Sequence, residues 1–437
     1  MIKFYKIFLF FISFVFCNYS FSQDNGAFDL RSSLESVLEN HRVIKASGID
    51  IKAAELRLKQ AKGGYYPSFD LTANYGHEHI NKRGAGNNTQ LVARDATAKL
   101  TQTITDFGLT DSTVKTSKLS LKQSRALEKQ IKNDILVRAL TAYLRVIQSR
   151  ESVKFAIQSV SNIKKQTELE DAAVSAGGGL TSDVLQAKSQ LAGAQARQIQ
   201  FEGVLSAAKH EFEYVFGFFP NQLNDLLLTK SIFDQLPKSI EEAEELTMKN
   251  NPSLLAARIT EDIGKEAINT ARATLFPTVK GIISHSEKQD FGGIVGHKRE
   301  SSAKIDFSYP LNLSFSEYAG KDAAIESYQA TATRIRDQED MIKQMLRTTW
   351  DALKTAQQNA QFLTNQARIS GEFLELARQE RQAGNRTLLD VLGGETAMIN
   401  AQADAIAAKI EVLISSYTLL SLMGGLTLDT IELVSNE

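Results

Sequence analysis

Apolar and polar residues alternate along several stretches of the chain. The clearest case runs from Phe69 to Tyr75, where apolar side chains occupy every second position. A period of two predicts a β-strand with one apolar and one polar face. Four such strands are expected, at about 68–80, 94–107, 277–287 and 301–315. The stretches between paired strands are rich in glycine, asparagine and charged residues and predict exposed loops at 81–92 and 287–300.

Elsewhere the apolar residues recur in alternating steps of four and three, which is typical of helices that pack as coiled coils. One such series comprises Ile399, Ala403, Ile406, Ile410, Leu413, Tyr417 and Leu420. The stretch Thr110–Asp171 contains no proline or glycine, so we expect one helix about 93 Å long. A second long helix is expected at Lys321–Gln382.

The chain contains the same pattern twice. The stretch DVLQAKSQLAGAQA, which begins at Asp183, matches DVLGGETAMINAQA, which begins at Asp390. Pro67 and Pro277 occupy equivalent places, where a helix pattern changes to a strand pattern, because proline lacks the amide hydrogen that a helix needs. We expect a signal peptide at 1–22, a first repeat at 23–219, a linker at 220–237, a second repeat at 238–425 and a tail at 426–437.

The first 22 residues have the features of a secretory signal peptide. Lys3 and Lys6 precede an apolar run, and the small residues Ser20 and Ser22 suit cleavage after Ser22. A lipoprotein signal that uses Cys17 is the alternative, although Phe16 stands where such a signal needs a small residue. Whether Cys17 is lipidated stays open.

Composition excludes several classes of protein. The 50 Lys and Arg balance 51 Asp and Glu, which argues against a nucleic-acid partner. A single cysteine excludes a disulfide framework and a multi-cysteine metal site. The chain contains no phosphate-binding G-x-x-x-x-G-K-[ST] and no G-x-S-x-G, so we expect no cofactor, no metal site and no enzyme activity. After residue 22 no apolar run of the length of a membrane helix is expected, which leaves membrane insertion as strands or a soluble protein beyond the inner membrane.

Aromatic residues gather where the predicted strands meet the helices. They are Tyr65, Tyr66, Phe107, Phe276, Tyr309, Phe315 and Tyr318. Two interpretations are open. The residues could form an interfacial girdle on a lipid-facing barrel. They could equally pack as a core at the junction of helices and sheet.

The order of these elements, twice over, resembles the TolC family of outer-membrane efflux and secretion proteins. The stretches AGGGLTSDVL at 176–185, AGNRTLLDVL at 383–392 and NNPSLLAAR at 250–258 carry the resemblance. It implies a mainly α fold with a transmembrane β-barrel portion, in which duplicated α-β-β-α halves contribute four strands per chain to a twelve-stranded barrel of a homotrimer. Independently, four strands cannot close a barrel, and an open edge is not viable in lipid.

The resemblance also implies a function and partners. The protein would be a passive exit duct of a tripartite efflux pump or a type I secretion system in the outer membrane of a Gram-negative-type bacterium. Its helices would extend into the periplasm, and its partners would be a periplasmic adaptor, an inner-membrane transporter and outer-membrane lipid. The alternative is a periplasmic coiled-coil adaptor or scaffold without a pore, which explains the heptads but not the strands. The sequence does not identify the cargo.

Candidate site residues lie at two turns between helices. The turns are marked by Gly177, Gly178, Gly179 and Gly384, because glycine permits a sharp helical reversal. By the resemblance, these turns form the periplasmic mouth and the surface on which the adaptor docks. The resemblance further implies that Asp390 lines the constriction and that Arg386 bonds Asp183 in a closed state. Both aspartates could instead be first-turn carboxylates that stabilise a helix.

The sequence departs from the family pattern at two positions in this region. A second aspartate often follows three residues after the position of Asp390, and Gly393 stands there in this chain. A tyrosine that completes the closing contacts is replaced by Arg381. The acidic ring is therefore expected to be thinner, and the full set of closing contacts is not expected.

Overall fold

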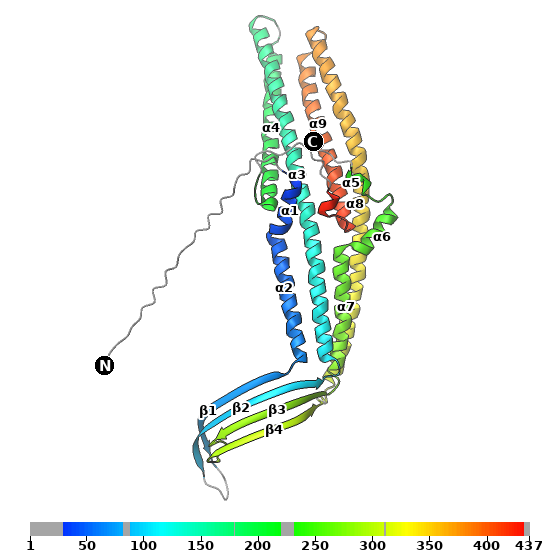
Figure 1. The fold of residues 1–437 in the computed structure, drawn as a ribbon. Coiled ribbons are helices and arrows are strands. Elements are labelled where there is room, and N and C mark those ends of the chain that lie inside the picture. Colours follow the sequence, from blue (N-terminus) through cyan, green and yellow to red (C-terminus); the bar gives the residue numbers. More distant parts are fainter. Residues whose placement is uncertain (1–28, 82–87, 179, 220–230, 310–311, 432–437) are drawn as a thin grey trace, which may run out of the picture.

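A computed structural model describes residues 29–81, 88–178, 180–219, 231–309 and 312–431 of the chain. These residues form an elongated bundle of helices with a sheet at one end (Figure 1). The predicted signal peptide, with Cys17, and the tip residue Gly179 lie outside the described residues. So does most of the predicted linker at 220–237.

Both halves of the chain contain the same elements in the same order, as the repeated sequence predicts. The first half comprises α1 (Leu30–Asn40), α2 (Arg42–Lys62), the short 3-10 turn η1 (Gly63–Tyr65), β1 (Ser68–Ile80), β2 (Thr89–Thr105), α3 (Leu109–Ser175) and α4 (Thr181–Phe216). After the short α5 (Ser231–Asp234), the second half comprises α6 (Ile240–Asn250), α7 (Pro252–Ala273), β3 (Thr278–Gln289), β4 (His297–Ser308), α8 (Ser316–Gln382) and α9 (Leu388–Leu422). A 3-10 turn, η2 (Leu428–Thr430), follows α9.

The strands extend into stretches that were expected to be loops. β1 has the predicted bounds, but β2 begins at Thr89 and β4 runs from His297 to Ser308, so it starts earlier and ends earlier than the expected strand at 301–315. The loop interpretation is therefore wrong for residues 89–92, 287–289 and 297–300, which belong to strands. The segments 287–289 and 297–300 carry polar or charged residues on both faces, and in 89–92 Leu91 and Val92 are adjacent, so hydropathy does not alternate in any of them. Their backbones nevertheless pair, as Ile80 does with Thr89 and Gln289 with His297.

Two helices run the length of the bundle. α3 and α8 have 67 residues each, which corresponds to about 100 Å. The shorter helices α2 and α7 flank the sheet-side half, and α4 and α9 flank the other half (Figure 1). α3 packs against α7 and α9 as well as against its own neighbours α2 and α4, so it joins the two halves of the chain.

Helix boundaries follow from residues with a specific local role. Pro67 directly precedes β1 and Pro277 directly precedes β3, as expected for residues that stop a helix. The Asn251 side chain caps α7 by accepting a hydrogen bond from the Leu254 amide at 3.1 Å. Between β2 and α3, the Asp106 carboxylate accepts from the Gly108 and Thr110 amides at 3.2 and 2.9 Å, which stabilises the turn from strand to helix.

The main apolar core lies midway along the bundle, where helices of both halves meet. Leu34, Leu140, Phe212, Leu346 and Leu419 are at most 1% exposed and belong to one cluster. Burial, with a smaller contribution from a neighbouring tyrosine, raises the pKa of Tyr417 in this cluster to about 12. The phenol therefore stays neutral across the physiological pH range, as a buried group without a counter-charge must.

α9 corrects one expectation from the sequence. By length and composition alone, Leu388–Leu422 contains a stretch apolar enough to cross a membrane, although no such stretch was expected after residue 22. Half of that stretch is buried inside the protein. Its apolar character is accounted for by its place beside α3 and α8, as in the core helix of a bundle.

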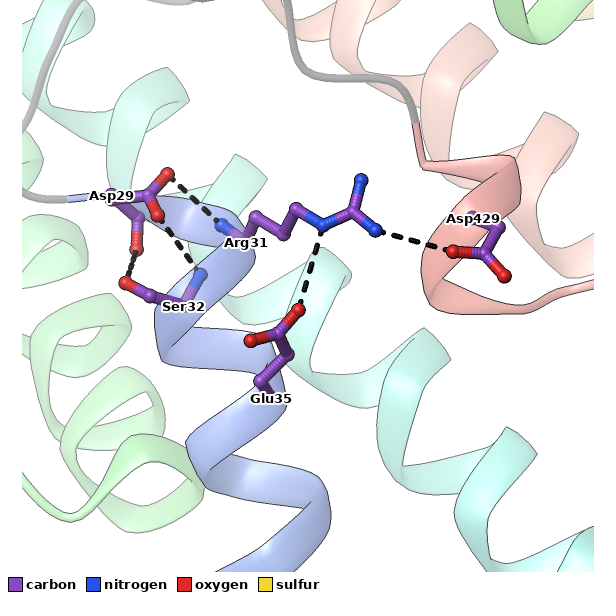
Figure 2. Close-up of polar contacts among 5 residues, drawn as sticks. All are labelled: Asp29, Arg31, Ser32, Glu35 and Asp429. Carbon is purple, nitrogen blue, oxygen red and sulfur yellow. Dashed lines mark hydrogen bonds and ion pairs between the residues drawn. The ribbon is translucent and has the colours of Figure 1, made fainter.

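The first helix begins with a charged cap that ties together distant parts of the chain (Figure 2). The Asp29 carboxylate accepts hydrogen bonds from the Arg31 and Ser32 amides at 3.3 and 3.0 Å. Arg31 in turn bonds Asp429 in η2 at 3.2 Å. Burial raises the pKa of the Asp29 carboxyl, but the hydrogen bonds from Ser32 and Arg31 together outweigh burial and hold the pKa below its ordinary value.

We predict that Asp29→Ala weakens α1 in a pH-dependent way. Loss of an N-cap costs about 1 kcal/mol, so amides of α1 should exchange with deuterium roughly fivefold faster at pH 7. Because the pKa of Asp29 is depressed in the folded chain, its charge stabilises α1 above the unfolded pKa of about 3.9. That stabilisation is lost as the pH falls through the folded pKa.

Hydrogen-exchange mass spectrometry at matched pH values checks this expectation. The difference between wild type and Asp29→Ala should shrink below about pH 4. Asp29→Asn, which keeps a capping oxygen without the charge, is the control and should show little dependence on pH. A difference between wild type and Asp29→Ala that persists unchanged in acid would contradict the assignment.

Candidate functional site

The sheet is open at both sides. Its four strands are antiparallel in the order β1-β2-β3-β4, so β1 and β4 are its edges. Within the described residues, neither edge strand has a partner on its outer side. Unpaired edges of this kind are templates for pairing with another chain.

The two faces of the sheet differ in chemistry. Residues paired across strands share a face, and one such row contains Phe69, Leu100, Ile283 and Ala303. Phe69 and Ile283 are 66% and 60% exposed, so this apolar face is not covered by the rest of the chain. The next row, on the opposite face, contains Asp70, Lys99, Ser284 and Ser302. An exposed apolar face opposite a polar one is the pattern of a barrel that faces lipid outside and water inside.

The apolar band crosses the strands at a slant. On β1 it reaches Tyr75, but the row that contains Tyr75 ends at the polar His297 on β4. On β4 the band reaches Phe307, which pairs with Val279, and Val279 in turn pairs with Thr105. This row lies past the first residue of β1, so β1 contributes no residue to it. A band of constant height slants in this way when the strands themselves tilt, as they do in closed barrels.

The aromatic residues at the junction of helices and sheet are exposed. Their exposed fractions range from 44% for Phe276 to 72% for Tyr66, which contradicts the interpretation that they form a packed core. Phe107 and Phe276 stack with ring centroids 5.5 Å apart. The Tyr65 hydroxyl donates to Asp111 at 2.6 Å, so this residue presents both a ring and a bonded polar end. Amphipathic rings of this kind are enriched at membrane interfaces.

The predicted tip turns are present at the opposite end of the molecule. After α3, Gly177 has φ +87°, and the Gly178 amide donates to the Ala173 carbonyl at 2.9 Å. After α8, Gly384 has φ +78°, and the amide that follows it donates to Glu380 at 2.9 Å. Both turns thus end a helix with the same left-handed glycine and the same hydrogen bond.

Asp390 and Asp183 occupy equivalent first-turn positions of α9 and α4. Asp390 is exposed, and its carboxylate accepts a hydrogen bond at 2.8 Å from Thr387, whose hydroxyl in turn accepts from the Asp390 amide. Asp183 is half-buried and accepts a long bond of 3.4 Å from Ser182. Both carboxylates lie where the helix dipole favours negative charge.

Arg386 contacts residues of its own hairpin. Its guanidinium bonds Glu380 at 2.7 Å and lies 5.0 Å from the centre of the Phe373 ring. Among the contacts found in the described chain, none joins Arg386 to Asp183. In this structure the arginine thus pairs with a carboxylate of the adjoining helix α8, and its bond to Asp183 in a closed state stays a prediction.

A different set of charged and polar side chains joins the two hairpins near the tip. We call these residues the hairpin tie: Asn162, Glu170, Arg378, Arg381 and Glu395. Arg381 on α8 bonds Glu170 on α3 at 2.7 Å. Glu395 on α9 accepts from Arg378 at 2.5 Å and from Asn162 at 2.6 Å. The side chain of Glu395 is only 4% exposed, so these partners take the place of water around its carboxylate.

An apolar contact accompanies the hairpin tie. Ile163, Ala187, Leu388 and Leu392 form a separate buried cluster that brings α3, α4 and α9 together. The sequence does hold a signal for the tie, because the buried positions of α9 step from Leu388 to Leu392, then to Glu395 and on to Ile399. A carboxylate in an otherwise apolar heptad series indicates a partner of opposite charge on a facing helix.

Comparisons with known proteins agree in matching this chain to outer-membrane efflux and secretion proteins. A family model described as outer membrane efflux protein matches residues 33–212 and 245–425. The outer membrane efflux protein BepC of Brucella suis biovar 1 is 22% identical over 92% of this chain and 87% of its own length. The proteases secretion protein PrtF of Dickeya chrysanthemi is 24% identical over 88% of this chain and 85% of its own length. The structure of the outer-membrane channel OprN superposes with a TM-score of 0.80 at 18% identity, covering 91% of this chain and 90% of that one.

We predict that Arg378→Ala destabilises the tip strongly. The substitution leaves the buried Glu395 carboxylate without its cation, which costs about 3–5 kcal/mol. Arg368→Ala on the same helix is the matched control, because Arg368 pairs with Glu372 at 2.6 Å on the surface and such a pair contributes about 0.3–0.5 kcal/mol. Urea unfolding in detergent, followed by circular dichroism, measures both changes. Equal losses in the two variants would show that the burial of Glu395 has no energetic role.

Proposed function

Because the chain belongs to the outer membrane efflux protein family, a family of channel proteins, we propose that it forms the duct of a three-part export machine. The TolC-family resemblance, the outer-membrane location and the role as an exit duct are confirmed by this membership. The assembly, the partners and the gate described below are our proposal.

The observation that carries the proposal is the open, two-faced sheet. A scaffold without a pore would leave the apolar face in water, whereas a membrane duct buries it in lipid. In lipid, however, unpaired edge groups are too costly to tolerate. We infer that β4 of one copy pairs with β1 of the next, so that three copies supply twelve strands and the ring closes.

The helices support the same assembly. The described chain leaves apolar residues of α8 exposed at Phe362 (69%), Ile369 (50%), Phe373 (45%) and Leu376 (54%). Their spacing of seven, four and three residues is that of a coiled-coil seam without a partner. A neighbouring copy would cover this seam, and three copies would then surround a tunnel that continues the barrel.

The partners follow from the place of the tip. We assign the turns at Gly177, Gly178 and Gly384 to the surface on which a periplasmic adaptor docks, because they lie at the end of the molecule farthest from the sheet (Figure 1). An inner-membrane transporter would deliver cargo through the adaptor. One relative is named for efflux and another for protease secretion, and our proposal covers both kinds of machine.

The gate is assigned to the same end. Asp390 is exposed beside the turn after α8, and a three-fold ring would bring three such carboxylates towards one axis. Like charges gathered in this way repel one another unless a cation binds between them. Asp183 and Arg386 border the same mouth. Within each chain, we assign to the Arg381–Glu170 bond the role of holding the two hairpins together.

We predict that Asp390 controls divalent block of the channel. In a planar bilayer the wild-type protein should conduct small, cation-selective currents that divalent cations block. Asp390→Ala should remove most of the block, because the ring loses its charge. Asp404→Ala, at another exposed aspartate further along α9, is the matched control and should keep the block.

The outcomes separate the gate from the duct. Wild-type currents with unchanged block in Asp390→Ala would move the gate to other residues and leave the duct intact. Failure of the folded protein to insert into the bilayer would contradict the proposed function itself.

A further inference from the structure

We propose that residues 290–296, between β3 and β4, form a flap that folds over the polar face of the sheet and narrows the outer mouth of the duct. The inference rests on the proposed function, since that face lines the lumen only in a closed barrel. β3 ends at Gln289, opposite Arg94, whereas β2 continues to Thr89. The outer ends of β1 and β2 therefore extend past β3 and offer a surface that the flap can cover.

The flap has a defined internal structure. At its base the Asp290 amide donates to the Gly296 carbonyl at 2.9 Å, and the Gly296 amide donates to the Asp290 carboxylate at 2.8 Å. Between them Gly292 and Gly293 have φ values of +67° and +74°. Successive residues of this conformation turn their amide hydrogens to one side and create a site for an anion.

Glu78 supplies that anion from two strands away. Its carboxylate accepts hydrogen bonds from the Gly292 amide at 2.7 Å and from the Gly293 amide at 3.3 Å. Glu78 belongs to β1, so the flap must cross β2 to reach it. Two charge-assisted bonds to one carboxylate hold the flap in this position.

The contacts of Gly293 show which face the flap covers. A Cβ atom at this residue would lie 2.9 Å from Thr89 Oγ1 and 3.2 Å from the end of the Ile80 side chain. Ile80 and Thr89 pair across the strands and share the face of Glu78, which is the polar face described above. The flap thus lies against the inner wall of the proposed barrel, with no room for a side chain at Gly293.

The exposed part of the flap is apolar. Ile294 and Val295 are 70% and 72% exposed, so the rest of the chain leaves most of each side chain uncovered. Three copies of the chain would place three such pairs in the outer lumen. An apolar constriction impedes water and ions by dewetting, so the flap would act as an outer gate distinct from the acidic ring at the tip.

Cysteine accessibility in intact cells tests the flap. Thr72 lies on the polar face of β1, further from the outer end than Glu78, and Leu71 is its neighbour on the apolar face. The chain has one cysteine, Cys17, so the unsubstituted protein serves as the blank. Thr72→Cys is treated from outside with a small charged thiol reagent and with a bulky maleimide-polyethylene glycol. Both labelling reactions are repeated on a double variant that combines Thr72→Cys with Glu78→Ala.

We expect the bulky reagent to modify Thr72→Cys about tenfold faster when Glu78→Ala removes both charge-assisted bonds. The small reagent should react at similar rates in the two backgrounds. Glu78→Gln, which keeps an acceptor without the charge, should give an intermediate rate. Glu300→Ala is the matched control, because Glu300 is an exposed glutamate on the same face that pairs with Lys298 at 3.2 Å.

Equal rates with the bulky reagent in the presence and absence of the Glu78 carboxylate would overturn the flap. The small reagent tests the proposed duct independently of the flap. Reaction at Thr72→Cys but not at Leu71→Cys supports a lumen behind the flap. Equal reaction at both positions would contradict the proposed barrel and, with it, the premise of this inference.

Discussion

The structure depends on the hydrogen-bonding requirement of strand edges in lipid. A four-stranded sheet has two edges whose backbone groups lack partners within the described chain, and a membrane offers no water to replace them. The apolar face that includes Phe69 and Ile283 cannot remain in water either. Both demands would be met if copies of the chain closed one barrel, so the proposed assembly follows from how few strands each chain contributes.

The helices extend far beyond the sheet and would continue the proposed ring over a long distance. α3 and α8 each run about 100 Å from the sheet to the tip, and α3 packs against helices of both halves. The halves meet in an apolar core at mid-length and in the hairpin tie near the tip. The tie uses a buried carboxylate, Glu395, where the heptad series otherwise places apolar residues. A buried charge adds little net stability but penalises any arrangement that separates it from Arg378 and Asn162.

Much of this organisation could be predicted from residues, and the exceptions have physical causes. β1 was found with its predicted bounds because Phe69 to Tyr75 alternate. The outer part of β4 was missed because Lys298, Arg299 and Glu300 leave no apolar face, although their backbones still pair. At the tip, both turns were predicted from glycine. The expected partner of Arg386 was Asp183, whereas the structure pairs it with Glu380, and the Arg381–Glu170 pair was not predicted. A pattern fixes a position along a helix but not which carboxylate lies nearest to it.

The central claim is that the chain works as a closed ring of three copies. The most direct test is the mass of the detergent-solubilised protein, measured by native mass spectrometry with the detergent removed in the gas phase. The account predicts a single species of three times the mature chain's mass. A stable, folded single chain that still inserts into lipid bilayers and conducts would contradict it, because its strand edges would then be satisfied without copies of itself.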